Sequence, residues 1–303
     1  MAGTCRGAEH ERIGIRQRTA KQFGVGKMLI DFHTHIFPDK IAERSVQILI
    51  AGMKRQMGED YGGGKPLTCR PATLNGLLDN MKKGGVDRSI CLPIATKIEQ
   101  TASINRFAES VRSPEALSFG TLHPMDPDWE SILENLAERG FSGIKLHLQF
   151  QETDIDSPQV IRILKKCEAL GMLAIFHAGD DIGLPPPIYA TPEKISHVLA
   201  EMEGSHLIAA HLGGWNQWDD VEKYLVGTPI YMDTAFIRDF ISTEQCKRII
   251  RNHGADKILF GSDSPWEDPA DTLQFIGSLG LTEAEMSLIT HENAQRLLGE
   301  KTV

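Results

Sequence analysis

Four histidines and one aspartate in this sequence follow short apolar runs, and these are residue types that bind metal ions. The run IDFHTH ends in His33 and His35, two residues apart. Later apolar runs end at His177, His211 and Asp263 in the same way. Imidazole nitrogens combined with one carboxylate suit zinc, manganese, iron or nickel better than calcium or magnesium. The residue types therefore indicate metal-assisted chemistry.

Each of these residues has an ordinary structural explanation when it is considered alone. A lone His-x-His pair, or a single histidine at a strand end, is more often structural than catalytic, and Asp263 could simply cap the following turn. Their joint position is harder to explain by packing, because buried polar groups destabilise a protein unless they are paired or coordinated. The set predicted to hold one divalent ion is His33, His35, His177 and Asp263. Zinc is the expected ion, and manganese, iron and nickel are the alternatives.

Eight apolar runs have the length of strands, and helical patterns separate most of them. The predicted strands are Met28–His33, Arg88–Pro93, Ser118–His123, Gly143–Leu148, Leu173–His177, Leu207–His211, Ile230–Asp233 and Lys257–Gly261. The predicted helices include Asp39–Met57, Trp129–Arg139, Pro158–Leu170, Pro192–Glu203, Thr243–Asn252 and Thr290–Leu298. Strands joined by helical crossovers form a parallel sheet, and eight of them close into a (β/α)8 (TIM) barrel of the α/β class. Because strand side chains alternate, His33 and His35 should both point into the barrel mouth, at the carboxyl ends of the strands.

The chain is predicted to form one barrel domain, residues 28–303, after an extension. Its 303 residues suffice for a barrel of about 250 residues. Residues 1–27 are basic without an apolar run, so they do not form a secretory signal. They are expected to be a dispensable disordered extension or a non-native start, with a transit peptide as the remaining alternative. An insertion at about residues 38–85 follows the first strand and could cover the site.

Composition excludes several classes of protein. The 32 basic and 41 acidic residues give a net charge of −9, which argues against a nucleic-acid or anionic-membrane partner. No apolar run approaches the roughly 18 residues that span a membrane. Five scattered cysteines without a C-x-x-C pair argue against structural zinc or disulfides and favour a reducing cytoplasm; they are Cys5, Cys69, Cys91, Cys167 and Cys246.

Six motifs together resemble those of the amidohydrolase superfamily. They are DFHTH (31–35), GIKLH (143–147), FH (176–177), AHLGG (210–214), GSDSP (261–265) and NAQRLL (293–298). The resemblance runs from about Met28 to Leu298. Within the superfamily the chain is similar to the amidohydrolase-related branch, which includes aminocarboxymuconate-semialdehyde decarboxylase and many uncharacterised hydrolases. The resemblance implies a barrel with its metal at the carboxyl ends of the strands.

The resemblance also implies roles for the polar residues. His33 and His35 match ligands on the first strand, His177 the ligand on the fifth and Asp263 the ligand on the eighth, where Asp263 also orients the reacting water. His211 matches the sixth-strand histidine. In the mononuclear decarboxylase branch that histidine acts as a base on the metal-bound water, and in binuclear relatives it is itself a ligand. The catalytic residues are therefore expected to be His211 and Asp263.

Other residues near the strand ends have two interpretations each. Some superfamily members carboxylate a fourth-strand lysine to bridge two metals, but a plain ammonium that pairs with Asp263 or with substrate is favoured for Lys145. His147 and His123 could contact substrate or fill the upper barrel. Arg238 could bind a substrate carboxylate or form a surface ion pair. Aromatic residues that could wall the pocket or merely pack are Phe37, Tyr189, Trp215 and Trp266.

Two enzyme functions and one non-enzyme function fit these residues. The favoured function is hydrolysis of an amide, lactone or ester of a small molecule by a metal-activated water. The alternative is nonoxidative decarboxylation of an aromatic or unsaturated carboxylic acid, with Arg238 or Lys145 seating the carboxylate. The remote alternative is an inactive metal-binding scaffold, which has no reason to keep His211 beside an open metal position. Relatives in this branch often form dimers, so the resemblance implies a homodimer.

Overall fold

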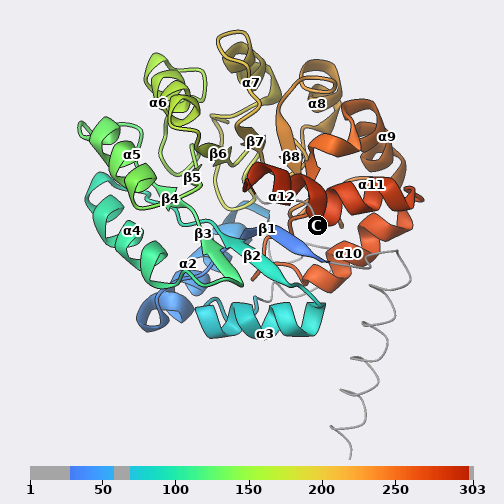
Figure 1. Cartoon of the computed structure of the whole chain (residues 1–303), viewed down its shortest axis with the longest axis horizontal. Helices are drawn as coiled ribbons and strands as arrows, with labels where there is room; N and C mark the ends of the chain where they lie inside the picture. Colours follow the sequence, from blue (N-terminus) through green and yellow to red (C-terminus); the bar gives the residue numbers. More distant parts are fainter. Residues whose placement is uncertain (1–27, 58–68, 300–303) are drawn as a thin grey trace, which may run out of the picture.

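Parallel strands occupy the centre of the molecule, and helices surround them (Figure 1). The computed structural model describes residues 28–57 and 69–299, so the predicted extension at 1–27 lies outside the described residues. The strands are β1 (Ile30–Thr34), β2 (Arg88–Cys91), β3 (Ala116–Ser118), β4 (Gly120–Thr121), β5 (Gly143–Leu146), β6 (Leu173–Phe176), β7 (Leu207–Ala209), β8 (Tyr231–Asp233) and β9 (Ile258–Leu259). The predicted TIM-barrel class is confirmed.

The strands pair in chain order. One sheet has the order β1-β2-β3 and the other the order β4-β5-β6-β7-β8-β9, with every pair parallel. The predicted third strand is divided at Phe119, because β3 pairs with β2 whereas β4 pairs with β5. Backbone hydrogen bonds also join the first strand to the segment after β9, from Phe32 N to Phe260 O (2.8 Å) and from Asp263 N to His33 O (2.9 Å). These bonds place His33 beside Asp263.

Several of the helices begin at N-terminal caps that the sequence supplies. The helices are α2 (Asp39–Met57), α3 (Leu74–Gly84), α4 (Thr101–Ser110), α5 (Trp129–Glu138), α6 (Pro158–Ala169), α7 (Pro192–Leu199), α8 (Trp218–Tyr224), α9 (Thr243–His253), α10 (Pro269–Ser278), α11 (Glu283–Ser287) and α12 (Asn293–Leu297). Ser157 and Thr191 each accept a hydrogen bond from a first-turn amide, and each is followed by proline, whose fixed φ suits the first helical position. Asp268 caps α10 in the same way.

The described part of the segment after β1 contains two helices. α2 has the predicted bounds, and α3 follows it within the predicted insertion at about 38–85. The predicted closing helix is instead divided into a π-helical turn, Leu288–Glu292, and α12. In Figure 1, α12 crosses the centre of the ring, and Ala294 on this helix packs against the apolar side chains inside the barrel.

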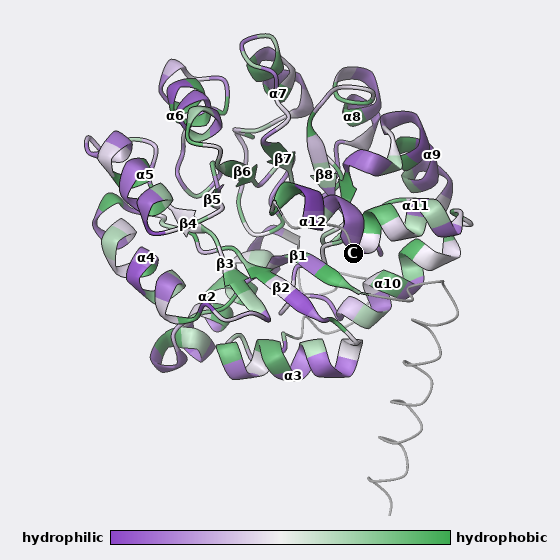
Figure 2. Cartoon of the chain, viewed as in Figure 1, coloured by the Kyte–Doolittle hydropathy of each residue, from purple (hydrophilic) through white to green (hydrophobic). Residues whose placement is uncertain are grey.

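Apolar side chains fill two layers. Ile90, Ile175 and Ile208 belong to a cluster inside the barrel, whereas Ile144 and Phe176 belong to the larger cluster between strands and helices. Figure 2 shows β6 and β7 as strongly hydrophobic, with mixed polarity on the surrounding helices. Within the described residues, no helix is both long and apolar enough to cross a membrane.

Candidate metal centre

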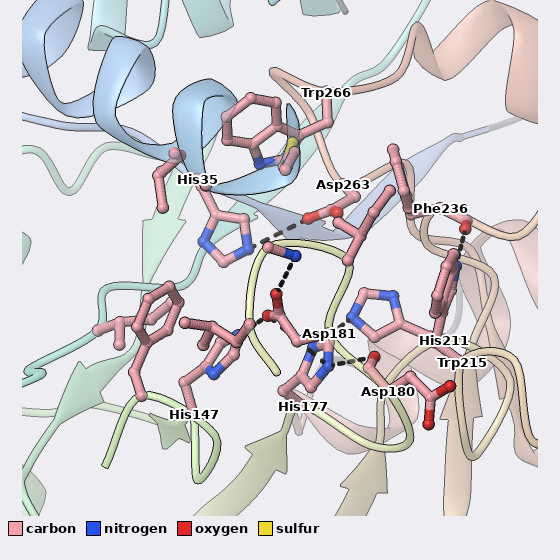
Figure 3. A pocket seen from close by; sticks show the side chains of 18 of the residues that line it. His35, His147, His177, Asp180, Asp181, His211, Trp215, Phe236, Asp263 and Trp266 are labelled. Carbon is pink, nitrogen blue, oxygen red and sulfur yellow. Dashed lines mark hydrogen bonds and ion pairs between the residues drawn. The ribbon is translucent and has the colours of Figure 1, made fainter. Parts of the chain in front are cut away.

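A cavity of about 290 Å³ lies at the carboxyl ends of the strands (Figure 3). Its lining brings together most of the predicted polar residues: His33, His35, Lys145, His147, His177, His211 and Asp263. In Figure 3, the labelled histidines and aspartates among them point toward the middle of the cavity from different strand ends. These residues come from distant parts of the sequence, and the barrel topology alone makes them neighbours.

A β-bulge in β1 aims the first two histidines. Between Asp31 and Thr34 the strand advances three residues while its partner β2 advances two. Phe32 can therefore pack inside the barrel, where its ring meets Phe119 edge-on, while His33 and His35 both face the cavity. Strict alternation would not place all three side chains on the inside.

Three of the predicted ligands form a compact triangle, which we call the β1 group: His33, His35 and Asp263. Nε2 of His33 lies 3.1 Å from Nε2 of His35 and 3.6 Å from Oδ1 of Asp263. The third side, between His35 Nε2 and Asp263 Oδ1, measures 3.2 Å. Ligand atoms on a tetrahedral zinc-like ion lie about 3.3 Å apart, so the triangle has the size of one face of such a coordination sphere.

The hydrogen bonds of His33 and His35 use Nδ1 of each ring, so Nε2 of each ring can bind a metal. Nδ1 of His33 is 2.7 Å from a carboxylate oxygen of Asp233, and Nδ1 of His35 is 2.8 Å from the carbonyl oxygen of Leu92. These oxygens only accept, so each Nδ1 donates, and in the neutral rings both Nε2 atoms carry lone pairs. Two lone pairs 3.1 Å apart beside a carboxylate repel one another unless a cation lies among them. The residues of the β1 group therefore fit a divalent metal.

His177 lies with a second set of side chains. The described residues hold one further cluster with possible metal-ligand spacing, His147, His177 and Asp181, which we call the β6 group. Asp181 Oδ2 lies 3.3 Å from His147 Nε2 and 4.0 Å from His177 Nε2. The His177 Nε2–H donates to the carbonyl oxygen of Asp180 (2.9 Å), so it turns no lone pair toward Asp181. The β6 group therefore fits a hydrogen-bonded cluster better than a metal site.

His211 links the two groups. Its Nε2 is 3.0 Å from Nδ1 of His177, and its ring centroid lies 5.2 Å from that of His33. Its Nδ1–H donates to the carbonyl oxygen of Ala235 (2.9 Å), so both atoms in the 3.0 Å contact are lone-pair nitrogens in neutral rings. The set of four ligands stays a prediction, since three members lie together and His177 lies outside that triangle, in contact with His211.

The proposed catalytic residues are among the described non-glycine residues that have a positive φ angle. His211 and Asp263 have φ angles of 59° and 62°. Residues other than glycine rarely adopt this left-handed region, which costs roughly 1–3 kcal/mol and concentrates at functional sites. Both residues lie just beyond a strand end, where this conformation turns their side chains toward the cavity.

Burial lowers the pKa of Lys145 and His211 in the cavity. Burial lowers the pKa of Lys145 to about 8, although the carboxylates of Asp233 and Asp263 oppose this shift. Its Nζ lies 3.3 Å from Nε2 of His33, so its ammonium can donate to that lone pair. Burial, with the charges of His33 and Lys145, also lowers the pKa of His211 to about 3. At neutral pH the imidazole of His211 is therefore uncharged.

Some sequence-predicted residues lie in the cavity wall and others do not. Phe37, Trp215 and Trp266 line it, and the indole N–H of Trp215 donates to the carbonyl of Phe236. Residues outside its lining are Arg238, Tyr189 and His123. Arg238 instead forms ion pairs with Asp239 (3.1 Å) and Glu267 (3.5 Å), as its structural interpretation implied.

Sequence reasoning missed two carboxylates. Asp233 ends β8 and binds both His33 and the backbone N–H of His211 (2.9 Å), so the strand-end rule that found Asp263 could have found it. Asp181 follows His177 by four residues in a loop, where no periodicity marks it. The hydrogen bond from His147 and the charges of both histidines outweigh burial and hold the pKa of Asp181 below its usual range.

Several solved structures share this fold at low sequence identity. An uncharacterised TIM-barrel protein from Bordetella bronchiseptica is 17% identical, with a TM-score of 0.68, over 90% of this chain and 99% of that one. A 5-carboxyvanillate decarboxylase from Novosphingobium aromaticivorans, complexed with manganese and 4-hydroxy-3-methoxy-5-nitrobenzoic acid, is 13% identical, with a TM-score of 0.64, over 90% and 96%. A probable 2-pyrone-4,6-dicarboxylic acid hydrolase from Acinetobacter baumannii, with citric acid bound, is 14% identical, with a TM-score of 0.58, over 90% and 100%.

The sequence itself gives the family. No curated protein matches the chain. A family model described as amidohydrolase, however, matches residues 30–299, which contain every residue of the β1 and β6 groups. The match covers most of the chain, and it agrees with the barrel and with the position of the histidines. The chain belongs to the amidohydrolase family.

Proposed function

We propose that this protein is a metal-dependent hydrolase that uses a metal-activated water on an amide, lactone or ester of a small molecule. The observation that carries the proposal is the orientation of His211. Its Nδ1–H donates to the carbonyl of Ala235, so Nε2 carries a lone pair, and this atom lies in the cavity beside Nδ1 of His177. A base that accepts a proton from water needs this arrangement.

Different side chains bind the metal, transfer the proton and exclude solvent in the proposed reaction. The β1 group holds the ion, expected to be zinc, and Asp233 fixes the ring of His33 through its Nδ1–H. When bound, the ion lowers the pKa of water and polarises a carbonyl oxygen. His211 Nε2 takes the proton from water and returns it to the leaving group, and Asp263 orients the water. Phe37, Trp215 and Trp266 exclude bulk solvent from the reacting atoms.

Decarboxylation of an aromatic acid is the second candidate, and the aromatic wall of the cavity favours it. A planar substrate could stack among these rings, and one of the similar folds is a 5-carboxyvanillate decarboxylase. Lys145 and Arg55 line the cavity and could seat a carboxylate. His211 would then deliver a proton to carbon, which requires protonation of a buried Nε2 first. Hydrolysis is the primary proposal because it uses His211 as a neutral base, the form that burial favours.

An isotope experiment separates the two reactions. Metal-loaded protein is screened against small lactones, amides, esters and carboxylated aromatics, and each reaction found is repeated in oxygen-18 water. Hydrolysis predicts the label in the product carboxylate. Release of carbon dioxide with solvent deuterium at carbon would replace this proposal by decarboxylation. The variant His211→Asn is the control, because background reaction from a contaminating enzyme would survive it.

A further inference from the structure

A second cavity adjoins the metal centre. It has a volume of about 500 Å³ and lies among the loops after β1 and β2, the helix α2 and the helix α4. Such a volume falls in the range of small-molecule sites. The residues that line both cavities are His35, Phe37, Ile48, Leu49, Ile94 and Phe150. The side cavity therefore shares a wall with the metal centre, including the predicted ligand His35, and the proposed catalytic residues His211 and Asp263 do not line it.

The lining of this side cavity carries almost no charge. Among the described residues that form it, His35 is the only titratable side chain, and that one faces the metal centre. Its other polar groups are largely engaged with one another. Thr96 Oγ1 donates to the side chain of Gln100 (3.0 Å), and Ser103 Oγ donates to the Gln100 carbonyl (2.9 Å). An ionic ligand would find no counter-charge here. An apolar group, by contrast, would bury few polar side-chain groups that lack a hydrogen-bond partner.

The two cavities therefore differ in the part of a molecule that each can hold. The metal-centre cavity contains carboxylates, histidines, Lys145 and Arg55, and the side cavity is lined by isoleucine, leucine, proline and phenylalanine side chains. We propose that the side cavity binds an uncharged apolar tail, an alkyl or acyl chain, of the same small molecule whose polar end reaches the metal centre. This inference rests on the proposed function for the polar end and adds the chemical class of the substrate.

The rim of the cavity supports an apolar occupant. Ile41 and Ile48 on α2 are 48% and 60% exposed, although both contribute to the lining. Large apolar side chains that remain exposed beside a concave surface are typical of ligand or partner sites. The shared wall with the metal centre favours a substrate tail over a second copy of the chain, because a subunit interface has no need to adjoin His35.

A series of linear alkyl hydroxamates tests the proposal by binding rather than by turnover. Hydroxamates from two to eight carbons are titrated into zinc-loaded and into metal-stripped protein by calorimetry. Affinity should rise roughly three- to fourfold for each methylene that enters the cavity, or on the order of 100-fold between two and six carbons. The increase with length should appear in both protein forms. If zinc-loaded protein does not bind acetohydroxamate more tightly than metal-stripped protein does, that result would count against the metal centre and not against the side cavity.

Variants locate the tail. Ile104→Trp, on α4 in the cavity wall, should abolish the increase with chain length and leave acetohydroxamate binding unchanged, and Ser103→Trp serves if that variant does not fold. The matched control is Arg106→Trp on the exposed side of the same helix. Equal affinities along the series, or no binding of octanohydroxamate, would overturn the proposal. Loss of a dimer in Ile41→Asp, without any increase with chain length, would make the cavity a subunit interface instead.

Discussion

The β1 group and the β6 group both contain two histidines and an aspartate, yet their nitrogens are used differently. In the β1 group, His33 and His35 each donate from Nδ1 to a fixed oxygen, and both Nε2 atoms converge on Asp263. In the β6 group, the ring nitrogen of His177 nearest Asp181 already donates to a backbone carbonyl. Similar composition therefore does not make two equivalent metal sites.

The difference originates in the elements that hold each group. The β1 group lies where the barrel closes, and a backbone hydrogen bond from Asp263 N to His33 O joins its two halves. In the β6 group, Asp181 belongs to the loop after β6. A ligand set held by strand pairing is preorganised, whereas one that includes a loop carboxylate can adapt to a substrate.

Loss of Asp263 should have the largest effect. Asp263→Asn removes the only carboxylate of the β1 group, so bound metal should be lost and kcat should fall by roughly 10³-fold or more. Asp181→Asn is the matched change in the β6 group. This variant should keep its metal, and its kcat should fall by less than about tenfold, as expected for the loss of one hydrogen bond that positions a side chain. Elemental analysis and initial rates measure both. Equal metal loss in the two variants would remove the distinction between the groups.

Substitution of His177 tests whether this residue binds the metal together with the β1 group. If His177 is the fourth ligand, His177→Ala should lower the metal content together with kcat. Full retention of metal and activity would restrict the metal centre to the β1 group and refute the set of four.

Replacement of His211 should separate chemistry from binding. His211→Asn should leave metal content largely intact while kcat falls by roughly 10²–10⁴-fold, the contribution of a general base. Elemental analysis beside the kinetics distinguishes this role from that of a ligand. Loss of metal would instead indicate a two-metal site, and Lys145 should then carry a carboxylate that bridges two ions about 3.5–4 Å apart.

The sequence predicted the fold and named the three residues that lie together in the β1 group, because both follow from local pattern. The alternation of apolar runs and helices gave the barrel, and the rule that polar residues follow strand ends identified His33, His35 and Asp263. It could not show the bulge in β1, since a bulge depends on the register of the partner strand rather than on residue type.

The prediction was weaker where side chains depend on loops. Asp181 and the aromatic Phe236 line the cavity from segments without periodicity, and nothing in their sequence neighbourhood marks them. Arg238 illustrates the converse. Its position after a strand left substrate binding and a surface ion pair both open, and ion pairs with Asp239 and Glu267 hold it outside the cavity lining. The direction of a side chain beyond a strand end is set by the loop backbone, which alternation does not describe.

Asp233 should matter for the β1 group although it is not a predicted ligand. Asp233→Asn weakens the acceptor for the Nδ1–H of His33, so metal affinity should fall by roughly 10–100-fold, the usual effect of losing an orienting carboxylate. Competition with a chromophoric chelator measures the affinity. Asp256→Asn, at a side chain that is 58% exposed, is the control and should not change it. Unchanged affinity in Asp233→Asn would show that the strand alone orients His33.

The smallest expected effect concerns stability and arises from Glu267, four residues after Asp263. Burial raises the pKa of Glu267 from 4.5 to about 7, although the guanidinium of Arg238 opposes the shift. Because the folded state favours the protonated carboxyl, its contribution to stability is complete below about pH 4.5 and is lost as the pH rises through about 7. Between pH 5 and 8 the wild-type Tm should therefore fall by a few degrees more than that of Glu267→Gln, which has no proton to lose. Differential scanning calorimetry at several pH values measures this difference, with the exposed Glu244→Gln as the control. Parallel pH profiles for the wild type and Glu267→Gln would mean that Arg238 neutralises Glu267 in the folded state. The ion pair between Glu267 and Arg238 would then persist over this whole pH range, and no neutral acid would form.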